Sequence, residues 1–429
     1  MSSIRWNLLW IVLTGLQLVA TLVCAETYPE QDYASYTFGH LGGPRDIIGD
    51  KRYVYWLSSG KLRIAKKDSV IKFEPKVPPA TKQNPKPKPE PFTFVSELDL
   101  KHAVEIESGG KKVIQRRGLP DRLCFISSKM LCASTGLHLR LIDIRNQKKP
   151  KIVDTLRLAK NTYRGVSSIR SNGKGNVWAA CRRGGLVRLK IDRDKMSVVS
   201  RTPVNGWASD VLLAGNHAFV ATWRGLEVFD VSGTEPKRLS ELDTYRHCEY
   251  LALSGNTLFF TSKYYLVAID ISDVANPKIL SEIGTIDPFF YSGAVSLKAI
   301  GEYIYCSHTE GGVYVWHFDR PSKQFKLLIQ TSYWGDRKKA PSRKEKAELV
   351  RKKMEELTGL GMDEEHAKAA AADAWQATSY LIAVGLHVDT KRKCLFVNPY
   401  DWGKTAGSHV HVYSYDLNVP KAQLVNWTE

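Results

Sequence analysis

The chain has 429 residues, 43% of them hydrophobic, and a formal net charge of +18 at pH 7. This hydrophobic share is ample for stacked β-sheets. A charge of this sign and size disfavours basic partners and favours acidic ones, such as polyanionic glycans, anionic envelope surfaces or nucleic acid.

The first 25 residues have the pattern of an export signal. Arg5 provides a positive start, residues 8–23 are apolar, and small residues follow before a cleavage point at Glu26. We therefore expect a secreted protein, periplasmic or extracellular, with no membrane span after cleavage. The alternatives are an uncleaved signal anchor, because the apolar run approaches membrane-spanning length, and a lipoprotein attached through Cys24. Export also removes nucleic acid from the expected partners.

A proline- and lysine-rich run, residues 74–91, interrupts the first strand-like segments of the mature chain. Proline has no backbone N–H to donate to a neighbouring strand, so a run with this many prolines is unlike a sheet strand and favours an extended polyproline form. We expect a solvent-exposed loop inserted in the first structural repeat. The polar and aromatic segment 28–38 could add a closing strand to the last one.

The most regular stretch contains the same pattern twice. Residues 226–231 (LEVFDV) are followed by a polar loop and Pro236-Lys237, and forty residues later 266–271 (LVAIDI) are followed by Pro277-Lys278. Two further β-rich segments precede each copy. Four short strands per roughly 40 residues are typical of a propeller blade. One blade cannot bury both faces of its sheet, so the copies must stack around a common axis.

This pattern resembles the LVIVD repeat, an apolar strand that ends in Asp and is usually followed by an Asn-Pro turn. Further copies can be placed by their terminal Asp, and the seven markers are Asp68, Asp143, Asp192, Asp230, Asp270, Asp319 and Asp416. The resemblance implies an all-β fold, a seven-bladed β-propeller over residues 26–429. All the markers except Asp68 are expected near the end of a third strand. It implies no activity, because a scaffold does not fix a function.

Residues 336–378 abandon β character. Ser342 and Glu345 form a capping box at the start of one helix, and a second helix begins at Asp363. We expect a helical hairpin inserted between blades six and seven. It should rise on the face that carries the inter-blade loops, where it would either roof the central funnel or decorate the rim.

The cysteines and histidines carry no recognisable metal or cofactor signal. Six cysteines follow the export signal, mostly within apolar strand segments and without a CxxC motif: Cys124, Cys132, Cys181, Cys248, Cys306 and Cys394. We expect buried small apolar side chains, although Cys124 and Cys132 could face each other across a hairpin. His409 and His411, with His387 nearby, lack a third ligand at diagnostic spacing. No metal and no cofactor are expected.

Arginines, lysines and aromatic residues recur in the loops between blades and in the loops between second and third strands. In a propeller these two sets of loops share a face. The expected ligand-binding residues are Arg45, Arg122, Tyr163, Arg164, Arg182, Trp223, Arg224, Tyr250, Lys263, Tyr264 and His308. Guanidinium groups bind carboxylate or sulfate in pairs, and flat rings stack on sugars. Alternatively, the arginines tie blades together by pairing with acidic residues: Asp46, Asp121, Asp210 and Glu249.

Three functions fit these residues, and whether the protein is an enzyme stays open, since no HExxH, GxSxG or phosphate-loop motif occurs. The first is a monomeric exported propeller that binds an anionic polysaccharide or an envelope protein. The second is a lyase of uronic-acid-containing glycans, in which Arg246 neutralises the carboxylate, His247 takes the α-proton, and Tyr245 or Tyr291 protonates the leaving oxygen. The third is a protein–protein interaction scaffold that engages its partner through the hairpin or the proline-rich loop.

Overall fold

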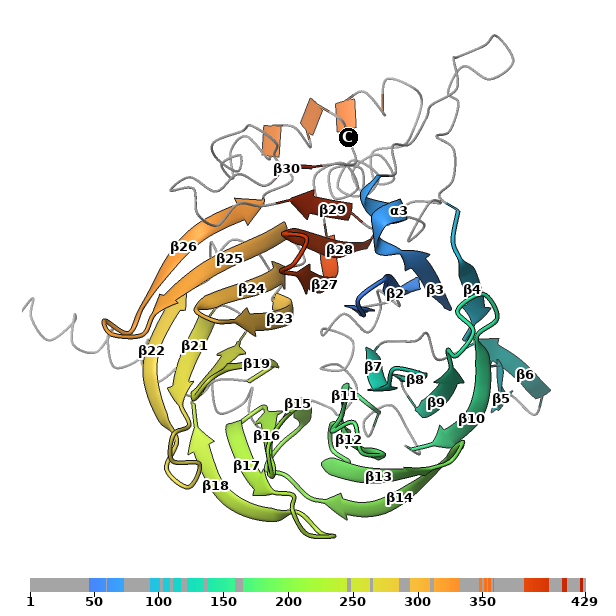
Figure 1. Ribbon diagram of the computed structural model, residues 1–429, viewed down its shortest axis with the longest axis horizontal. Coiled ribbons are helices and arrows are strands. Elements are labelled where there is room, and N and C mark those ends of the chain that lie inside the picture. Colours follow the sequence, from blue (N-terminus) through green and yellow to red (C-terminus); the bar gives the residue numbers. More distant parts are fainter. Residues whose placement is uncertain are drawn as a thin grey trace, which may run out of the picture. The chain divides into compact units, whose positions relative to one another are not determined.

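The computed structural model describes residues 46–58, 60–72, 93–100, 103–108, 111–116, 122–134, 137–158, 165–244, 248–262, 265–284, 294–308, 312–331, 347–348, 351–352, 354–355, 358, 382–400, 411–414 and 425–426. These residues form seven four-stranded antiparallel sheets and one two-stranded hairpin, all within residues 43–429. In every four-stranded sheet the strands follow one another in chain order. Figure 1 shows the seven sheets side by side around a central axis. The predicted all-β, seven-bladed propeller is confirmed.

The blades are numbered in chain order. Blade one contains β1 (Ile47–Gly49), β2 (Tyr53–Ser58), β3 (Lys61–Lys66) and β4 (Ser96–Asp99), with helix α3 (Lys67–Ile71) after β3. Blade two contains β7 (Arg122–Ser127), β8 (Met130–Ser134), β9 (His138–Asp143) and β10 (Lys151–Arg157), and the hairpin β5 (Ala103–Ser108) and β6 (Lys111–Arg116) precedes it. Blade three contains β11 (Ser168–Ser171), β12 (Asn176–Ala180), β13 (Leu186–Asp192) and β14 (Lys195–Thr202). Blade four contains β15 (Ala208–Ala214), β16 (His217–Thr222), β17 (Gly225–Asp230) and β18 (Lys237–Asp243).

The remaining three blades follow the same order. Blade five contains β19 (Tyr250–Ser254), β20 (Thr257–Thr261), β21 (Tyr265–Asp270) and β22 (Lys278–Gly284). Blade six contains β23 (Ala294–Ile300), β24 (Tyr303–His308), β25 (Gly312–Asp319) and β26 (Gln324–Thr331). Blade seven contains β27 (Ile382–Asp389), β28 (Cys394–Tyr400), β29 (His411–Ser414) and β30 (Val425–Asn426).

The first strand of each blade lies innermost. Each inner strand contacts the inner strands of the two neighbouring blades, and β1 contacts β27, so the ring is closed. Blade seven draws all four of its strands from the C-terminal part of the chain. Segment 28–38, the proposed source of a closing strand, lies outside the described residues.

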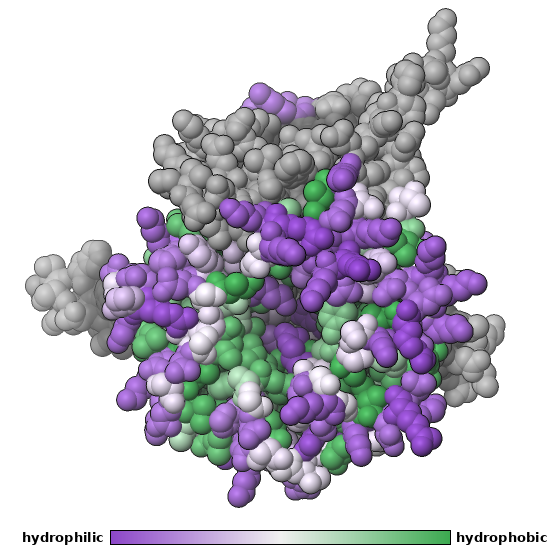
Figure 2. Space-filling view, viewed as in Figure 1, coloured by the Kyte–Doolittle hydropathy of each residue, from purple (hydrophilic) through white to green (hydrophobic). Residues whose placement is uncertain are grey.

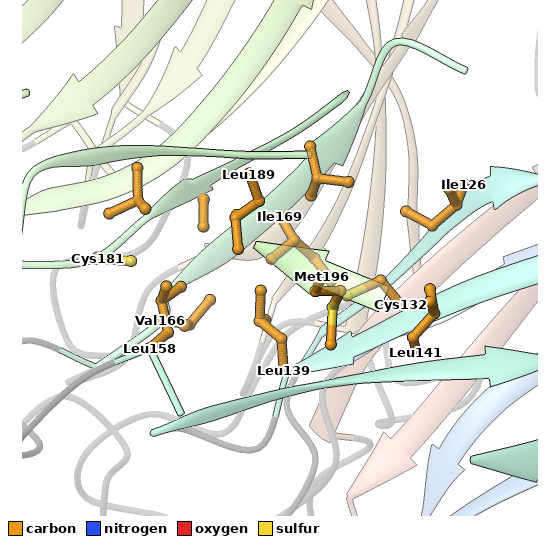
Figure 3. Close-up of a cluster of buried hydrophobic side chains, with 13 residues drawn as sticks. Ile126, Cys132, Leu139, Leu141, Leu158, Val166, Ile169, Cys181, Leu189 and Met196 are labelled. Atoms are coloured by element: carbon orange, nitrogen blue, oxygen red, sulfur yellow. The ribbon is translucent and has the colours of Figure 1, made fainter. Parts of the chain in front are cut away.

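The hydrophobic core is divided among the junctions between blades. Each of the seven clusters of buried side chains in the described part of the chain combines residues from two neighbouring sheets. Figure 3 shows the cluster between blades two and three, where Leu139 and Leu141 of β9 face Ile169 of β11. Successive residues of a strand point to opposite faces, so Phe219 of β16 packs toward blade five and Val220 toward blade three.

The repeated Asp has a defined structural role. The third strand ends at the marker residue in blades two to six: Asp143, Asp192, Asp230, Asp270 and Asp319. The Asp230 carboxylate accepts a hydrogen bond of 2.8 Å from the Ser232 N–H, which closes the turn into the fourth strand. The lysine after the repeat's proline pairs directly opposite the marker, as in Asp230–Lys237 and Asp270–Lys278. The predicted register is confirmed in these five blades.

The first marker differs from this pattern. Asp68 lies in α3, two residues after the end of β3. Asp416 lies outside the described residues.

Gly225 begins the third strand of blade four at a point that excludes a side chain. Its φ is 143°, and a Cβ there would overlap the carbonyl oxygen of Leu242 on β18. Gly225→Ala is therefore expected to lower the free energy of unfolding by about 2–4 kcal/mol. Gly215→Ala is the matched control, because that turn glycine has a φ of 57° and open space around it. Its expected effect is about 1 kcal/mol. Equal urea-unfolding midpoints for the two variants would contradict the overlap.

Blades one and seven are joined by a buried polar cluster. Lys67, on α3, donates a hydrogen bond of 2.8 Å to the Asp389 carboxylate at the end of β27, and both side chains are buried. A second bond of 2.9 Å joins the same ammonium to His387 Nε2, which accepts it because an ammonium can only donate. Arg392 completes the cluster by contacting Asp389 at 3.1 Å and Asp68 at 2.9 Å.

His387 is expected to make stability fall as the solution becomes mildly acidic. Burial, together with the charge of Lys67, lowers the pKa of this imidazole to about 3. In the unfolded chain it takes up a proton below about pH 6.5. Stability from His387 is thus complete above pH 6.5 and is lost as pH falls toward 3, by about 1.4 kcal/mol per pH unit. In His387→Gln the amide oxygen can still accept a hydrogen bond from Lys67, but the side chain does not titrate. The urea-unfolding midpoint of this variant should therefore change less between pH 6.5 and 5 than that of the parent. An equal pH dependence in both proteins would show that His387 is not the cause.

The two predicted insertions are described only in part. Residues 74–91 lie between β3 and β4 and outside the described residues. Between β26 and β27, the described residues 347–348, 351–352, 354–355 and 358 are helical, and Arg351 pairs with Glu348 and Glu355 one turn away on either side. The rest of the hairpin, and the face on which it rises, lie outside the described residues. No described helix is long and apolar enough to cross a membrane, and residues 8–23 are not among those described.

Candidate functional site

Two sets of loops meet between blades three and four. Trp207 lies in the connection from β14 to β15, and Trp223 lies in the turn from β16 to β17. Their rings stack with centroids 4.4 Å apart and planes 23° apart. Arg183, from the turn between β12 and β13, holds its guanidinium carbon 5.3 Å from the Trp207 ring centroid. We call these three residues, together with Arg182 and Arg224 beside them in the same turns, the Arg–Trp cluster. At this junction, inter-blade loops and second-to-third-strand loops share one face, as expected.

The backbone beneath the Arg–Trp cluster is tied across the blade junction. Arg182 and Ala208 exchange two backbone hydrogen bonds, of 3.1 and 3.0 Å. Arg182 adopts a left-handed conformation with φ of 43° to make this bridge. The Trp223 N–H donates to the Trp207 carbonyl oxygen at 3.2 Å. The cluster therefore stands on a fixed frame, and such unusual backbone conformations persist where the surrounding structure holds them.

The Arg–Trp cluster presents charge and aromatic surface to solvent. Arg183 and Arg224 are exposed, while Trp207 and Trp223 are half-buried. Guanidinium groups over indole rings are held by the ring quadrupole, typically with about 0.5–1 kcal/mol at exposed sites. The arrangement can bind an anion beside a flat apolar surface.

Arg122 and Tyr250 lie at the axis. Arg122 begins β7 and Tyr250 begins β19, and the Arg122 guanidinium carbon is 5.2 Å from the Tyr250 ring centroid. Arg122 Nε donates a hydrogen bond of 3.0 Å to the Ser167 carbonyl oxygen of the next blade. These two predicted residues come together from blades two and five, away from the Arg–Trp cluster.

The structure therefore gathers five of the predicted binding residues into two places: Arg182, Trp223 and Arg224 at the Arg–Trp cluster, and Arg122 and Tyr250 at the axis. His308 ends β24, and only its backbone is described. The other predicted residues lie outside the described part of the chain: Arg45, Tyr163, Arg164, Tyr245, Arg246, His247, Lys263, Tyr264 and Tyr291.

Acidic residues do tie neighbouring blades together, but mainly through backbone N–H groups. Asp46 accepts a hydrogen bond of 2.9 Å from the Leu123 N–H of blade two. Asp210 accepts an equivalent bond of 2.9 Å from the Leu251 N–H of blade five. The arginine that contacts Asp210 is Arg170, with 3.3 Å between Nη2 and Oδ1. Asp46 and Asp210 therefore connect neighbouring blades, but not through the predicted arginines.

A cavity of about 190 Å³ lies among the inner strands. Its polar lining includes Asp46, Arg122, Arg170, Asp210, Tyr250 and Lys298. Figure 2 shows a hollow at the centre of the ring with hydrophilic side chains in it.

The sequence reasoning missed Arg170 and Lys298. Each follows the buried apolar residue of an inner strand, Ile169 in β11 and Leu297 in β23. Arg170 and Lys298 line the cavity together with these neighbours in the same strands. A cation directly after the buried apolar residue of an inner strand is the signal that could have identified both.

The cysteines are structural. All six described cysteines are free thiols, and five of them are buried. Cys124, which is half-buried, pairs directly opposite Cys132 across the β7–β8 hairpin. Burial raises the pKa of Cys124 to about 11. Such thiols are poor nucleophiles, as the prediction of buried apolar side chains implies.

The family model of the LVIVD repeat matches residues 205–241 and 246–285, which span blades four and five. No curated protein matches the chain in sequence.

Among solved structures, a protein from Lactobacillus plantarum is similar with a TM-score of 0.53 and 14% identity, over 74% of this chain and 87% of that one. The Cps50 (Swd1) β-propeller domain of Myceliophteria thermophila has a TM-score of 0.52 and 11% identity, over 87% and 96%. The RRP9 WD40 repeats have a TM-score of 0.52 and 9% identity, over 89% and 94%. At these identities the likeness concerns the fold alone. The chain is a β-propeller that contains LVIVD repeats in blades four and five.

Proposed function

We propose that this propeller is an exported, non-catalytic binding protein whose loop-rich face takes an acidic polysaccharide. The Arg–Trp cluster is the observation that carries the proposal. It places an exposed guanidinium over a stacked pair of indoles, on a backbone frame shared by two blades.

The chemistry of this cluster matches the chemistry of an acidic sugar chain. Arg183 and Arg224 can each bind a carboxylate or sulfate through paired N–H groups. Half-buried indoles supply rigid apolar surface for the faces of pyranose rings, with little side-chain entropy to lose. The net charge of +18 adds long-range attraction for a polyanion, which weakens as salt is added.

Export is part of the same proposal. The apolar run at residues 8–23 and the small residues before Glu26 support a cleaved signal. We expect mass spectrometry of the secreted protein to find Glu26 at its N-terminus, and an intact Met1 would reject cleavage.

A lyase acting on uronic-acid-containing glycans is the second candidate. The connection that holds Tyr245, Arg246 and His247 leads directly into Tyr250, which lines the axial cavity beside Arg122. Elimination requires a cation at the carboxylate, a base and an acid, and Tyr291 on the next connection could supply the acid. Turnover would release an unsaturated product that absorbs ultraviolet light, whereas a binding protein would release none.

Variants of the Arg–Trp cluster test the proposed face. Trp223→Ala and Arg183→Ala are each expected to weaken binding of polygalacturonate about 10- to 100-fold, from the loss of one charged or stacking contact. Lys149→Ala, in the exposed turn between β9 and β10, removes one positive charge elsewhere and should bind within about twofold of the parent protein.

Isothermal titration calorimetry gives the affinities, and thermal unfolding verifies that each variant is folded. Equal affinities for all three variants and the parent would move the site off this face. Absence of any glycan binding, with capture of an envelope protein instead, would favour a scaffold engaged through its insertions.

A further inference from the structure

The axial cavity holds three cations and two carboxylates, but the carboxylates are already committed. Both oxygens of Asp46 accept backbone N–H groups, from Ile47 at 3.1 Å and from Leu123 at 2.9 Å. Asp210 accepts from the N–H groups of Val211 and Leu251, each at 2.9 Å. It also accepts from the Ser168 hydroxyl and the Arg170 guanidinium. Both oxygens of each carboxylate therefore already accept a backbone hydrogen bond, and one of the two donors comes from a neighbouring blade.

Two of the cations, Arg170 and Lys298, make fewer contacts than the Asp210 carboxylate. Arg170 reaches Asp210 through one long contact of 3.3 Å. Lys298, half-buried in the cavity wall, makes no hydrogen bond and no ion pair with any residue the structure describes. Burial lowers the pKa of its ammonium, and the positive charge of Arg170 lowers it further, while Asp46 and Asp210 act in the opposite direction. A charged group removed from bulk water without a partner is unfavourable, so this wall favours an added anion.

The size of the cavity limits the anion. Its volume of about 190 Å³ exceeds the roughly 150 Å³ of an apolar cavity known to hold benzene. It can hold one six-membered ring with a carboxylate, and it is too small for a polymer. Leu123, Phe125 and Ile169 contribute apolar lining beside the cations.

We propose that the axial cavity binds the carboxylate of a single ring-sized organic acid, with Lys298 as the principal ligand and Arg170 and Arg122 as supporting cations. This site goes beyond the polysaccharide function, because it uses none of the residues of the Arg–Trp cluster. The carboxylate can belong to a free small acid or to the terminal sugar of a uronate oligomer.

Calorimetric titration of the purified full chain at low salt tests the site, with glucuronate, a short galacturonate oligomer, glucose and sulfate as probes. Glucuronate should bind saturably, and glucose should not. Lys298→Met should weaken glucuronate binding at least about tenfold, the typical effect of one charged hydrogen bond. Lys237→Met, on the outer strand β18, is the control for loss of one positive charge and should bind glucuronate as the parent does.

Tighter binding of the oligomer than of glucuronate would identify the terminal sugar as the source of the carboxylate, and equal binding would identify a free acid.

Folding and site occupancy can be separated. Lys298→Met removes a half-buried cation that has no partner among the described residues, so the variant should unfold at a temperature no lower than the parent's. Glucuronate should then raise the melting temperature of the parent but not that of Lys298→Met. Lys298→Gln provides a second variant of similar length without the charge. A uronate bound at the Arg–Trp cluster would still raise the melting temperature of Lys298→Met, which keeps this test independent of the outer face. Unaltered glucuronate binding in both Lys298 variants, no saturable binding by the parent, or equally tight binding of sulfate would overturn the proposal.

Discussion

Lys67→Met is expected to lower the free energy of unfolding by about 3 kcal/mol, the lower end of the range for breaking a buried ion pair. The substitution leaves the buried Asp389 carboxylate without its main partner. Burial alone would raise the pKa of Asp389, but the hydrogen bond and charge of Lys67, with those of Arg392, lower it to about 2. Arg392 lies 3.1 Å from the Asp389 carboxylate and is not changed by the substitution, so it still compensates part of the negative charge of Asp389.

The Lys67–Asp389 pair helps to close the ring because it joins the first blade to the last. Lys66→Met is the matched control: its side chain is exposed, it is adjacent in sequence, and its expected effect is within about 0.5 kcal/mol. The double variant Lys67→Met with Asp389→Leu should recover much of the loss, since it removes both buried charges. Urea unfolding measures all three. Equal midpoints for the Lys66 and Lys67 variants would show that ring closure does not depend on this pair.

Asp210→Ala is expected to lower the free energy of unfolding by about 2–4 kcal/mol. The carboxylate accepts hydrogen bonds from residues of blades three, four and five, including the buried Leu251 N–H. Its removal leaves that N–H without a partner away from water, and an unmade buried hydrogen bond is more destabilising than the average bond is stabilising.

The matched control for Asp210 is Asp192, an exposed acid that ends β13 in the neighbouring blade. Asp192→Ala should change stability by no more than about 0.5 kcal/mol. Denaturant unfolding at neutral pH measures both variants. A loss for Asp210→Ala as small as that of the control would mean that the blade junctions rest on hydrophobic packing alone.

The propeller architecture could be predicted because short segments of the sequence specify each strand and turn of a blade. Alternating apolar residues, a terminal Asp and a following Pro-Lys recur at near-constant spacing, and each has a local cause in the strand-turn-strand unit. The insertions were visible as breaks in that spacing. By contrast, the contact between Lys67 and Asp389 joins residues 322 positions apart. These two residues come together only when the ring of blades closes, and no short sequence pattern indicates which residues then meet.

The binding surface was predicted in part for a related reason. Turn position alone placed Arg182, Trp223 and Arg224 on one face, and the structure joins them to Arg183 and Trp207. Lys298 and Arg170 were missed because the binding residues were predicted from the loops alone, and these two residues lie in inner strands. The charges that act on a cation in such a strand come from other blades, as Asp46, directly before β1 of blade one, acts on Lys298 of blade six.

The central claim is that the Arg–Trp cluster recognises negative charge on a sugar chain. Hydrogen–deuterium exchange of the full chain, with and without polygalacturonate, measures it most directly, with the fully methyl-esterified polymer as the neutral comparison. The acidic polymer is expected to protect the turns at residues 181–185 and 222–225 and the connection at 205–208, and added salt should remove this protection. The esterified polymer should protect none of them. Equal protection by both polymers, or protection confined to other blades, would contradict the account.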